Sequence, residues 1–236
     1  ALDLVHAYKP DAITLDIGLP TVDGWQVLDR LKHHPETRHI PVHIISGLDN
    51  RHEALRAGAI AELEKPVDAD RLDDAFSQIR SFIDSRVKRL LIVEDDESQR
   101  RSMEELVGGE DVDVVAVEAA EAALARLREQ HFDCMVLDLG LRDMSGFDLL
   151  EQVKSDPRVT TREIPIIIYT GRELSPQEET RLKRYAETII VKDVKSPERL
   201  LDETALFLHR IEAQLPDQKR RMLEQPLLQR LPFGKV

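Results

Sequence analysis

The chain has 236 residues, of which 42% are hydrophobic and 33% charged, as in ordinary globular proteins of one or two domains. No apolar run approaches the roughly 20 residues that span a bilayer, and a formal net charge of −12 repels a phosphate backbone, so we expect neither a membrane segment nor direct binding of nucleic acid. The single cysteine, Cys134, excludes an intrachain disulfide and a multi-cysteine metal site, and it favours a cytoplasmic location.

An internal repeat divides the chain. Residues 10–32 recur in altered form as residues 132–154, and Asp16 corresponds to Asp138 at an offset of 122 residues (138 minus 16). Two shorter matches follow in the same order, IPVHIISG with IPIIIYTG and LEKP with IVKD. A period of domain length indicates tandem domains and not short stacked repeats. We therefore predict a first unit, a second unit and a C-terminal linker or tail at residues 1–86, 88–214 and 215–236.

The first unit is expected to be incomplete at its N-terminal end. The stretch before Asp16 has room for one helix and one strand, and it lacks a counterpart of RLLIVEDD in the second unit. The inner strand at Ala12–Leu15 would then present an uncovered hydrogen-bonding edge. We expect this edge to be covered by a second copy of the chain, by the second unit or by residues outside this sequence. A homodimer is therefore one of three alternatives.

The second unit alternates strands and helices. Short apolar runs rich in β-branched residues are typical of strands buried on both faces of a parallel sheet, and they lie at 89–93, 112–117, 132–137, 164–169 and 187–191. Helical patterns begin near Glu97, Ala119, Ser145, Ser175 and Ser196. The last helix is expected to reach about Ala213, with one face made by Leu200, Thr204, Phe207, Ile211 and Leu215. The alternation predicts an α/β fold with a doubly wound five-stranded parallel sheet. We expect the flavodoxin-like form of this fold, in which the strand order is 2-1-3-4-5.

Three carboxylates are expected at one edge of that sheet. Glu94 and Asp95 follow the first strand and Asp138 follows the third, and these strands are neighbours in the predicted order. Like charges this close need neutralisation, which a hard cation such as Mg²⁺ supplies. Thr170 and Lys192 follow the fourth and fifth strands, so a hydroxyl and an ammonium should face the same pocket. Such a set is suited to hold a phosphoryl group during its transfer to a carboxylate.

This ordered set resembles the signature of response regulator receiver (CheY-like) domains, and the resemblance covers nearly all of residues 1–214. It implies that Asp138 is phosphorylated and that Thr170 and Lys192 contact the phosphoryl group. It also implies a Mg²⁺ site, in which Glu94 acts largely through water, made by Glu94, Asp95, Asp138 and the carbonyl of Gly140. In the first unit the same pattern is matched by Asp16, Ser46 and Lys65.

The sequence departs from the family pattern at several positions. No acidic pair precedes Asp16 in this sequence, which argues against Mg²⁺-dependent phosphorylation of Asp16. The position three before the lysine is aromatic in most members but is occupied here by Glu62 and Ile189, so the usual aromatic–threonine relay cannot operate. Arg142 stands where many members have proline, four residues after the phosphoacceptor. The peptide bond between Lys65 and its following proline is expected to be cis.

The resemblance implies two-component phosphorelay signalling. A histidine kinase or a histidine phosphotransfer protein would donate the phosphoryl group, and phosphorylation would switch a protein-interaction surface. A receiver catalyses its own phosphorylation and dephosphorylation, and the sequence contains no kinase core. We expect the parent to be a hybrid sensor histidine kinase or a multi-receiver response regulator.

Two other hypotheses stay open. The receivers could form a phosphorylation-independent scaffold for protein–protein interaction. A phosphatase-like enzyme with an aspartyl intermediate is disfavoured, because Gly18 and Gly140 occupy the positions where such enzymes carry a second aspartate.

Overall fold

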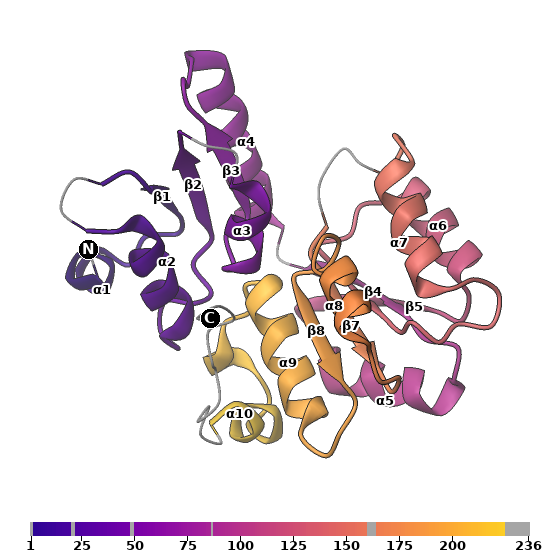
Figure 1. Ribbon diagram of the computed structural model, residues 1–236. Coiled ribbons are helices and arrows are strands. Elements are labelled where there is room, and N and C mark those ends of the chain that lie inside the picture. The colour runs from indigo at the N-terminus through magenta and orange to yellow at the C-terminus, as the bar shows by residue number, and fades with distance from the viewer. Residues whose placement is uncertain (1, 20–21, 48–49, 86, 160–163, 225–236) are drawn as a thin grey trace.

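The chain forms two α/β units, shown in Figure 1 by a computed structural model that describes residues 2–19, 22–47, 50–85, 87–159 and 164–224. The last helix of the first unit, α4 (Ala69–Asp84), is followed after a short connection by β4 (Lys88–Val93), the first strand of the second unit. Within the described residues, no helix is both long enough and apolar enough to cross a membrane.

The first unit contains a three-stranded parallel sheet in the order β1-β2-β3. Its other elements are α1 (Leu2–Tyr8), β1 (Ile13–Asp16), α2 (Gly24–His33), β2 (Val42–Ser46), α3 (Arg51–Arg56) and β3 (Ala61–Glu64). The carboxylate of Asp23 caps α2 by accepting a hydrogen bond from the backbone N–H of Trp25. Apolar residues of β1 and β2 then pack with α2, at Leu15, Leu28, Leu31, Val42 and Ile44. The Lys65–Pro66 bond is cis, as predicted.

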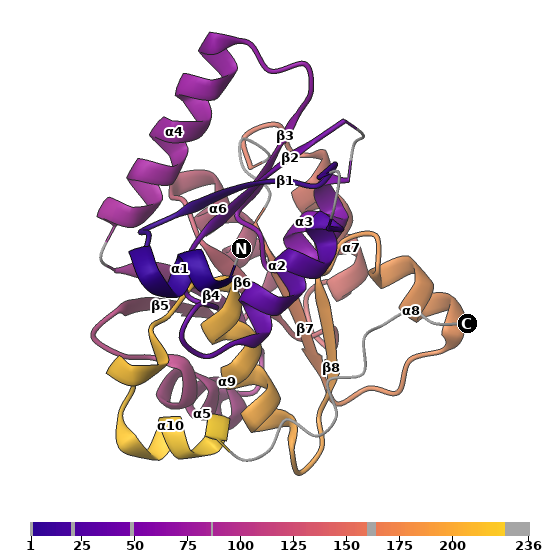
Figure 2. The same cartoon turned by 90° about the vertical axis from the view of Figure 1, so that its left-hand side faces the viewer.

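Strand β1 lies at the edge of this sheet. Within the described residues it pairs with β2 alone, so the second unit does not extend the sheet there. Figure 2 looks onto this side of the molecule, where α4 runs up one flank. Cover of the β1 edge by a second copy of the chain stays a prediction.

The second unit has a five-stranded parallel sheet in the order β5-β4-β6-β7-β8, which confirms the predicted 2-1-3-4-5 order. The strands that follow β4 are β5 (Val112–Val117), β6 (Cys134–Leu137), β7 (Ile166–Thr170) and β8 (Thr188–Val191). The helices are α5 (Glu97–Val107), α6 (Ala120–Glu129), α7 (Gly146–Ser155), α8 (Pro176–Leu182) and α9 (Ser196–Phe207), followed by a short 3-10 turn and α10 (Asp217–Glu224). Ser145 caps α7, and Ser175 forms a capping box with Glu178 at the start of α8.

Both faces of this sheet are covered, because successive strand residues point to opposite sides. One face packs against α6, α7 and α8 through strand residues that include Leu91, Met135 and Ile168. The other packs against α5 and α9 through Ile92 and Val136 among others. Each apolar run of the sequence therefore contributes side chains to the hydrophobic cores on both faces of the sheet, as expected for a doubly wound sheet.

The predicted end of the last helix is wrong. Helix α9 ends at Phe207 and not near Ala213. His209 adopts a left-handed backbone conformation, with φ of 51°, which ends the helix. Leu215 is buried with Leu201 and Leu223, so its apolar character reflects the docking of α10 and not a longer helix. Ile211 is 39% exposed and therefore does not belong to a buried helix face.

A buried polar contact joins the two units. Arg38, in the segment between α2 and β2, donates to Asp202 of α9 at 2.7 Å and to Glu212 at 2.5 Å. Nζ of Lys32 lies 3.3 Å from Nδ1 of His209. Figure 1 shows the same arrangement, with α2 of the first unit close to the yellow C-terminal elements. The first unit thus docks on the α9 side of the second.

Candidate functional site

The ends of two neighbouring strands bring three carboxylates together in the second unit. Val93, at the end of β4, is in register with Leu137, at the end of β6. The next residues are therefore adjacent, and Glu94, Asp95 and Asp138 each offer a carboxylate oxygen within 4.8 Å of the others. The backbone N–H of Asp138 donates to the Val93 carbonyl at 2.9 Å, which fixes the two strand ends against each other. The predicted cluster is present in the fold.

Lys192 supplies the positive charge of this cluster. Its Nζ lies 2.8 Å from Oε2 of Glu94 and 3.4 Å from Oδ2 of Asp138. Burial of Glu94 raises the pKa of its carboxyl, and the hydrogen bond from Lys192 partly offsets that rise. Lys192 thus pairs with two of the three carboxylates, and the cluster keeps an excess of negative charge.

One carboxylate oxygen of Asp138 has no hydrogen-bond partner among the described residues. Within the described residues, its Oδ1 is buried and has no hydrogen-bond partner, which is costly for a carboxylate oxygen. A Cβ placed on Gly140 would lie 3.6 Å from the other oxygen, Oδ2, so the backbone of residue 140 passes close to the same carboxylate. An unpaired oxygen among three carboxylates fits a hard divalent cation such as Mg²⁺. The cluster and the backbone of Gly140 are the groups that would hold it.

Thr170 borders the same edge of the sheet. It is the last residue of β7 and is buried, and its carbonyl accepts a hydrogen bond from the backbone N–H of Lys192 at 2.8 Å. Its hydroxyl oxygen accepts from the backbone N–H of Arg172 at 3.2 Å. A hydroxyl that accepts one bond still has its own proton to donate. The arrangement therefore offers a neutral donor beside the ammonium.

Three residues around the cluster were not assigned to the site from sequence. Gln99 accepts a hydrogen bond from Lys192 at 2.7 Å, and Arg100 donates to the Glu94 carbonyl at 2.7 Å. Nε of Arg142 lies 2.7 Å from Oδ2 of Asp95. The sequence drew attention to Arg142 only because many members of the family have proline at this position. Gln99 and Arg100 carried no signal, since polar residues are common in the first turns of helices.

The first unit places its three matching residues differently. Oδ2 of Asp16 lies 2.6 Å from Nζ of Lys65, and its Oδ1 accepts from the backbone N–H of Gly18 at 2.9 Å. The hydrogen bond from Lys65 lowers the pKa of Asp16. Ser46 is buried and its hydroxyl oxygen accepts from Asn50 at 3.2 Å. Among the described residues, Asp16 belongs to no group of three or more potential metal ligands, unlike Asp138.

Comparison with known proteins gives consistent matches. The sequence matches the response regulator receiver domain family over residues 1–77 and 90–205. The response regulator PleD of Caulobacter vibrioides is 27% identical over 199 residues, which cover 71% of this chain and 42% of PleD. Sporulation initiation phosphotransferase F of Bacillus subtilis is 36% identical over 76 residues, 32% of this chain and 61% of that protein. The chain thus spans less than half the length of PleD.

Solved structures give matches of the same kind. A response regulator receiver domain protein (CheY-like) from Methanospirillum hungatei JF-1 is 29% identical with a TM-score of 0.46, over 55% of this chain and 99% of that chain.

Proposed function

Because this chain belongs to the response regulator receiver domain family, we propose that its second unit accepts a phosphoryl group on Asp138 in a Mg²⁺-dependent reaction. The donor is the phosphohistidine of a histidine kinase or of a histidine phosphotransfer protein. The observation that carries the proposal is the buried, unpartnered Oδ1 of Asp138, set among the carboxylates of Glu94 and Asp95. Bound Mg²⁺ supplies positive charge to these carboxylates and to the phosphoryl oxygens.

In the proposed reaction a carboxylate oxygen of Asp138 attacks phosphorus. The phosphorus–oxygen bond forms as the phosphorus–nitrogen bond of phosphohistidine breaks, and the imidazole nitrogen keeps the electron pair. Lys192 already lies 3.4 Å from the Asp138 carboxylate, so its ammonium can pair with a phosphoryl oxygen after a small shift. The Thr170 hydroxyl can donate to a second oxygen. Both residues would then gain contacts that exist only in the phosphorylated state, which is what a two-state switch requires.

The proposal of phosphoryl acceptance is confined to Asp138. In the first unit, both carboxylate oxygens of Asp16 have partners, Lys65 and the backbone of Gly18. Ser46 and Lys65 nevertheless occupy the same places in the sheet as Thr170 and Lys192. We propose that the first unit contributes to signalling through its contact with the second.

Labelling by a small phosphodonor tests the proposal. The full chain is incubated with acetyl phosphate and Mg²⁺, and its mass is measured intact. Wild type should gain one phosphoryl group, Asp138→Asn none, and the matched variant of the first unit, Asp16→Asn, one. A chelator should abolish the gain. Labelling of Asp138→Asn to the wild-type extent would remove Asp138 from its proposed role.

A second candidate is a phosphorylation-independent scaffold. The contact of Arg38 with Asp202 favours it, because this buried contact docks the first unit on α9 of the second. The same experiment separates the two hypotheses: a scaffold predicts that none of the proteins is labelled. We propose that either activity belongs to a cytoplasmic multi-receiver response regulator or hybrid sensor histidine kinase. The match to response regulator PleD supports the former.

A further inference from the structure

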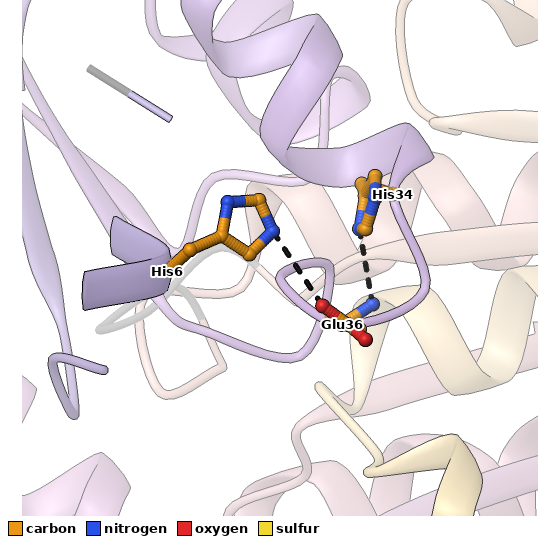
Figure 3. Close-up of side chains that lie close together, drawn as sticks. All are labelled: His6, His34 and Glu36. Atoms are coloured by element: carbon orange, nitrogen blue, oxygen red, sulfur yellow. Dashed lines mark hydrogen bonds and ion pairs between the residues drawn. The ribbon is translucent and has the colours of Figure 1, made fainter. Parts of the chain in front are cut away.

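A second group of metal-ligating side chains lies far from the carboxylate cluster, in the first unit. Figure 3 shows His6 of α1 pointing toward Glu36, with His34 on the other side of Glu36. Nε2 of His6 lies 3.6 Å from Oε2 of Glu36. The two imidazole rings meet edge to face, with centroids 5.2 Å apart. One ligand atom from each of the three residues lies within 4.8 Å of the others.

We propose that His6, His34 and Glu36 form a binding site for a divalent transition-metal ion, with Zn²⁺ as the foremost candidate. Imidazole nitrogen is a preferred ligand of Zn²⁺, whereas Mg²⁺ prefers oxygen, so this set selects a different class of metal from the carboxylates of the second unit. Two histidines and one glutamate are also a known ligand set for zinc sites that keep an open coordination position.

The geometry is close to what such an ion needs. Ligands bonded at about 2.0–2.1 Å in a tetrahedron lie about 3.3 Å from one another. The 3.6 Å between His6 and Glu36 is already near this value, and no pair of ligand atoms exceeds 4.8 Å. Closing the remaining gap takes rotation of side chains that are at the surface, since His6 and Glu36 are 41% and 74% exposed. No movement of the backbone core is required.

The position of His34 suits this role. Its Nδ1 accepts a hydrogen bond of 3.3 Å from the backbone N–H of Glu36, so in that tautomer the Nδ1 lone pair is directed at the backbone of residue 36. This bond is near the upper limit of length and would be exchanged for a stronger metal–nitrogen bond. The ring is held in place before the ion arrives.

The site opens toward solvent on the side of the second unit. His6 and Glu36 line a cavity of about 1120 Å³ that also borders Arg38 and the segment around His209. Three protein ligands leave a fourth position for water or for a small anionic ligand from this cavity. The ion would also tie α1 to the segment that carries Arg38, and it would therefore stabilise the part of the first unit that docks on α9.

Metal titration of the full chain without an affinity tag tests the proposal. The protein is stripped with a chelator and titrated with Zn²⁺ in saturating Mg²⁺, which occupies the carboxylate cluster of the second unit. The variants are His34→Gln and Glu36→Gln. The matched control is His33→Gln, which removes a neighbouring exposed histidine that pairs with Asp29 on its own helix. Thermal unfolding with and without Zn²⁺ is the second readout.

Wild type and His33→Gln should bind one Zn²⁺ with equal affinity and unfold at a higher temperature in its presence. Loss of a ligand should weaken binding by about tenfold or more, since loss of an outer-shell partner alone costs about 10–100-fold. The proposal is overturned if His34→Gln and Glu36→Gln keep wild-type affinity. It is equally overturned if His33→Gln loses as much affinity as they do, because binding would then be a general property of surface histidines.

Discussion

Nε of Arg142 lies 2.7 Å from Oδ2 of Asp95, at the mouth of the carboxylate cluster. The Arg142 side chain is 81% exposed, whereas that of Asp95 is 15% exposed. An exposed cation from the loop after β6 therefore pairs with a carboxylate that the proposed Mg²⁺ site needs. Bound Mg²⁺ would therefore compete with the guanidinium of Arg142 for the carboxylate of Asp95.

The variant Arg142→Ala should bind Mg²⁺ more tightly. The ion pair is exposed on one side, so its contribution is about 0.4–1 kcal/mol, which corresponds to about a two- to fivefold lower Kd. The measurement is a Mg²⁺ titration followed by the NMR signals of residues in the second unit.

Arg101→Ala is the matched control for this prediction. Arg101 is an exposed arginine on α5, it pairs with Glu97, and it lines the same acidic surface depression as Arg142. Its removal changes the net charge by the same amount without freeing Asp95. Equal tightening in both variants would assign the effect to long-range charge and contradict direct competition.

The carboxylate cluster could be predicted from sequence and its basic partners could not. Glu94, Asp95 and Asp138 follow buried parallel strands, and the backbone ladder alone brings such positions together. The position of Arg142 depends on the path of a loop and on the rotamers of a long exposed side chain. Neither is encoded in local periodicity. The contact of Gln99 with Lys192 likewise depends on the rotamers of two long side chains.

The fold was predictable where local signals and burial agree. Ser145 and Ser175 cap the helices that they were expected to begin, and the alternation of strands with helices predicts the parallel sheet. The end of α9 was missed because Leu215 continues a helical spacing although it is buried by α10. The apolar residue at position 215 matches a helical spacing by sequence, although its burial comes from tertiary packing against α10. The Arg38 contact was unpredictable for a related reason, since it joins positions 164 residues apart in the chain.

Arg38→Ala should loosen the contact between the units. The side chain is 4% exposed and faces two carboxylates, Asp202 and Glu212, that are 12% and 16% exposed. Removing the shared cation leaves two poorly hydrated negative charges, at a cost of about 3 kcal/mol. Urea unfolding should show the loss, and small-angle scattering should show a larger radius of gyration.

A surface ion pair provides the comparison for Arg38. Arg89 and Asp113 lie 3.6 Å apart and are each about half exposed, with values of 48% and 54%. Arg89→Ala should cost less than about 1 kcal/mol and leave the radius of gyration unchanged. A compact Arg38→Ala protein with the stability of Arg89→Ala would show that the buried pairs do not hold the units together.

Lys32 should make stability depend on pH. Burial lowers the pKa of Lys32 to about 7, and its Nζ donates to the carbonyls of Arg38 and Ile40. In the unfolded chain the group keeps its proton up to about pH 10.4. Between these values the unfolded state binds more protons, so this group makes the free energy of unfolding rise with pH by up to about 1.4 kcal/mol per unit.

Comparison with Lys32→Met isolates this effect. The variant lacks the titrating group, so wild type should gain stability relative to it as pH rises from about 7 toward 10. Urea unfolding at several pH values measures the difference. Lys195→Met, at an exposed lysine, should show no such trend against wild type. A constant difference between wild type and Lys32→Met would mean that Lys32 stays charged in the folded protein.

Gly24 occupies a position at which a side chain has no room. A Cβ at this first residue of α2 would lie 2.6 Å from Cα of Ile17 and 2.7 Å from the carbonyl oxygen of Asp16, both backbone atoms. Gly24→Ala should therefore force the turn after β1 away from the helix and cost about 1–3 kcal/mol in the free energy of unfolding. Gly47→Ala is the control, because a Cβ there meets nothing within 4 Å. Its effect should be small or stabilising, since alanine restricts the unfolded chain. Equal stability of the two variants in urea would show that the turn adjusts without strain and that packing does not require glycine at position 24.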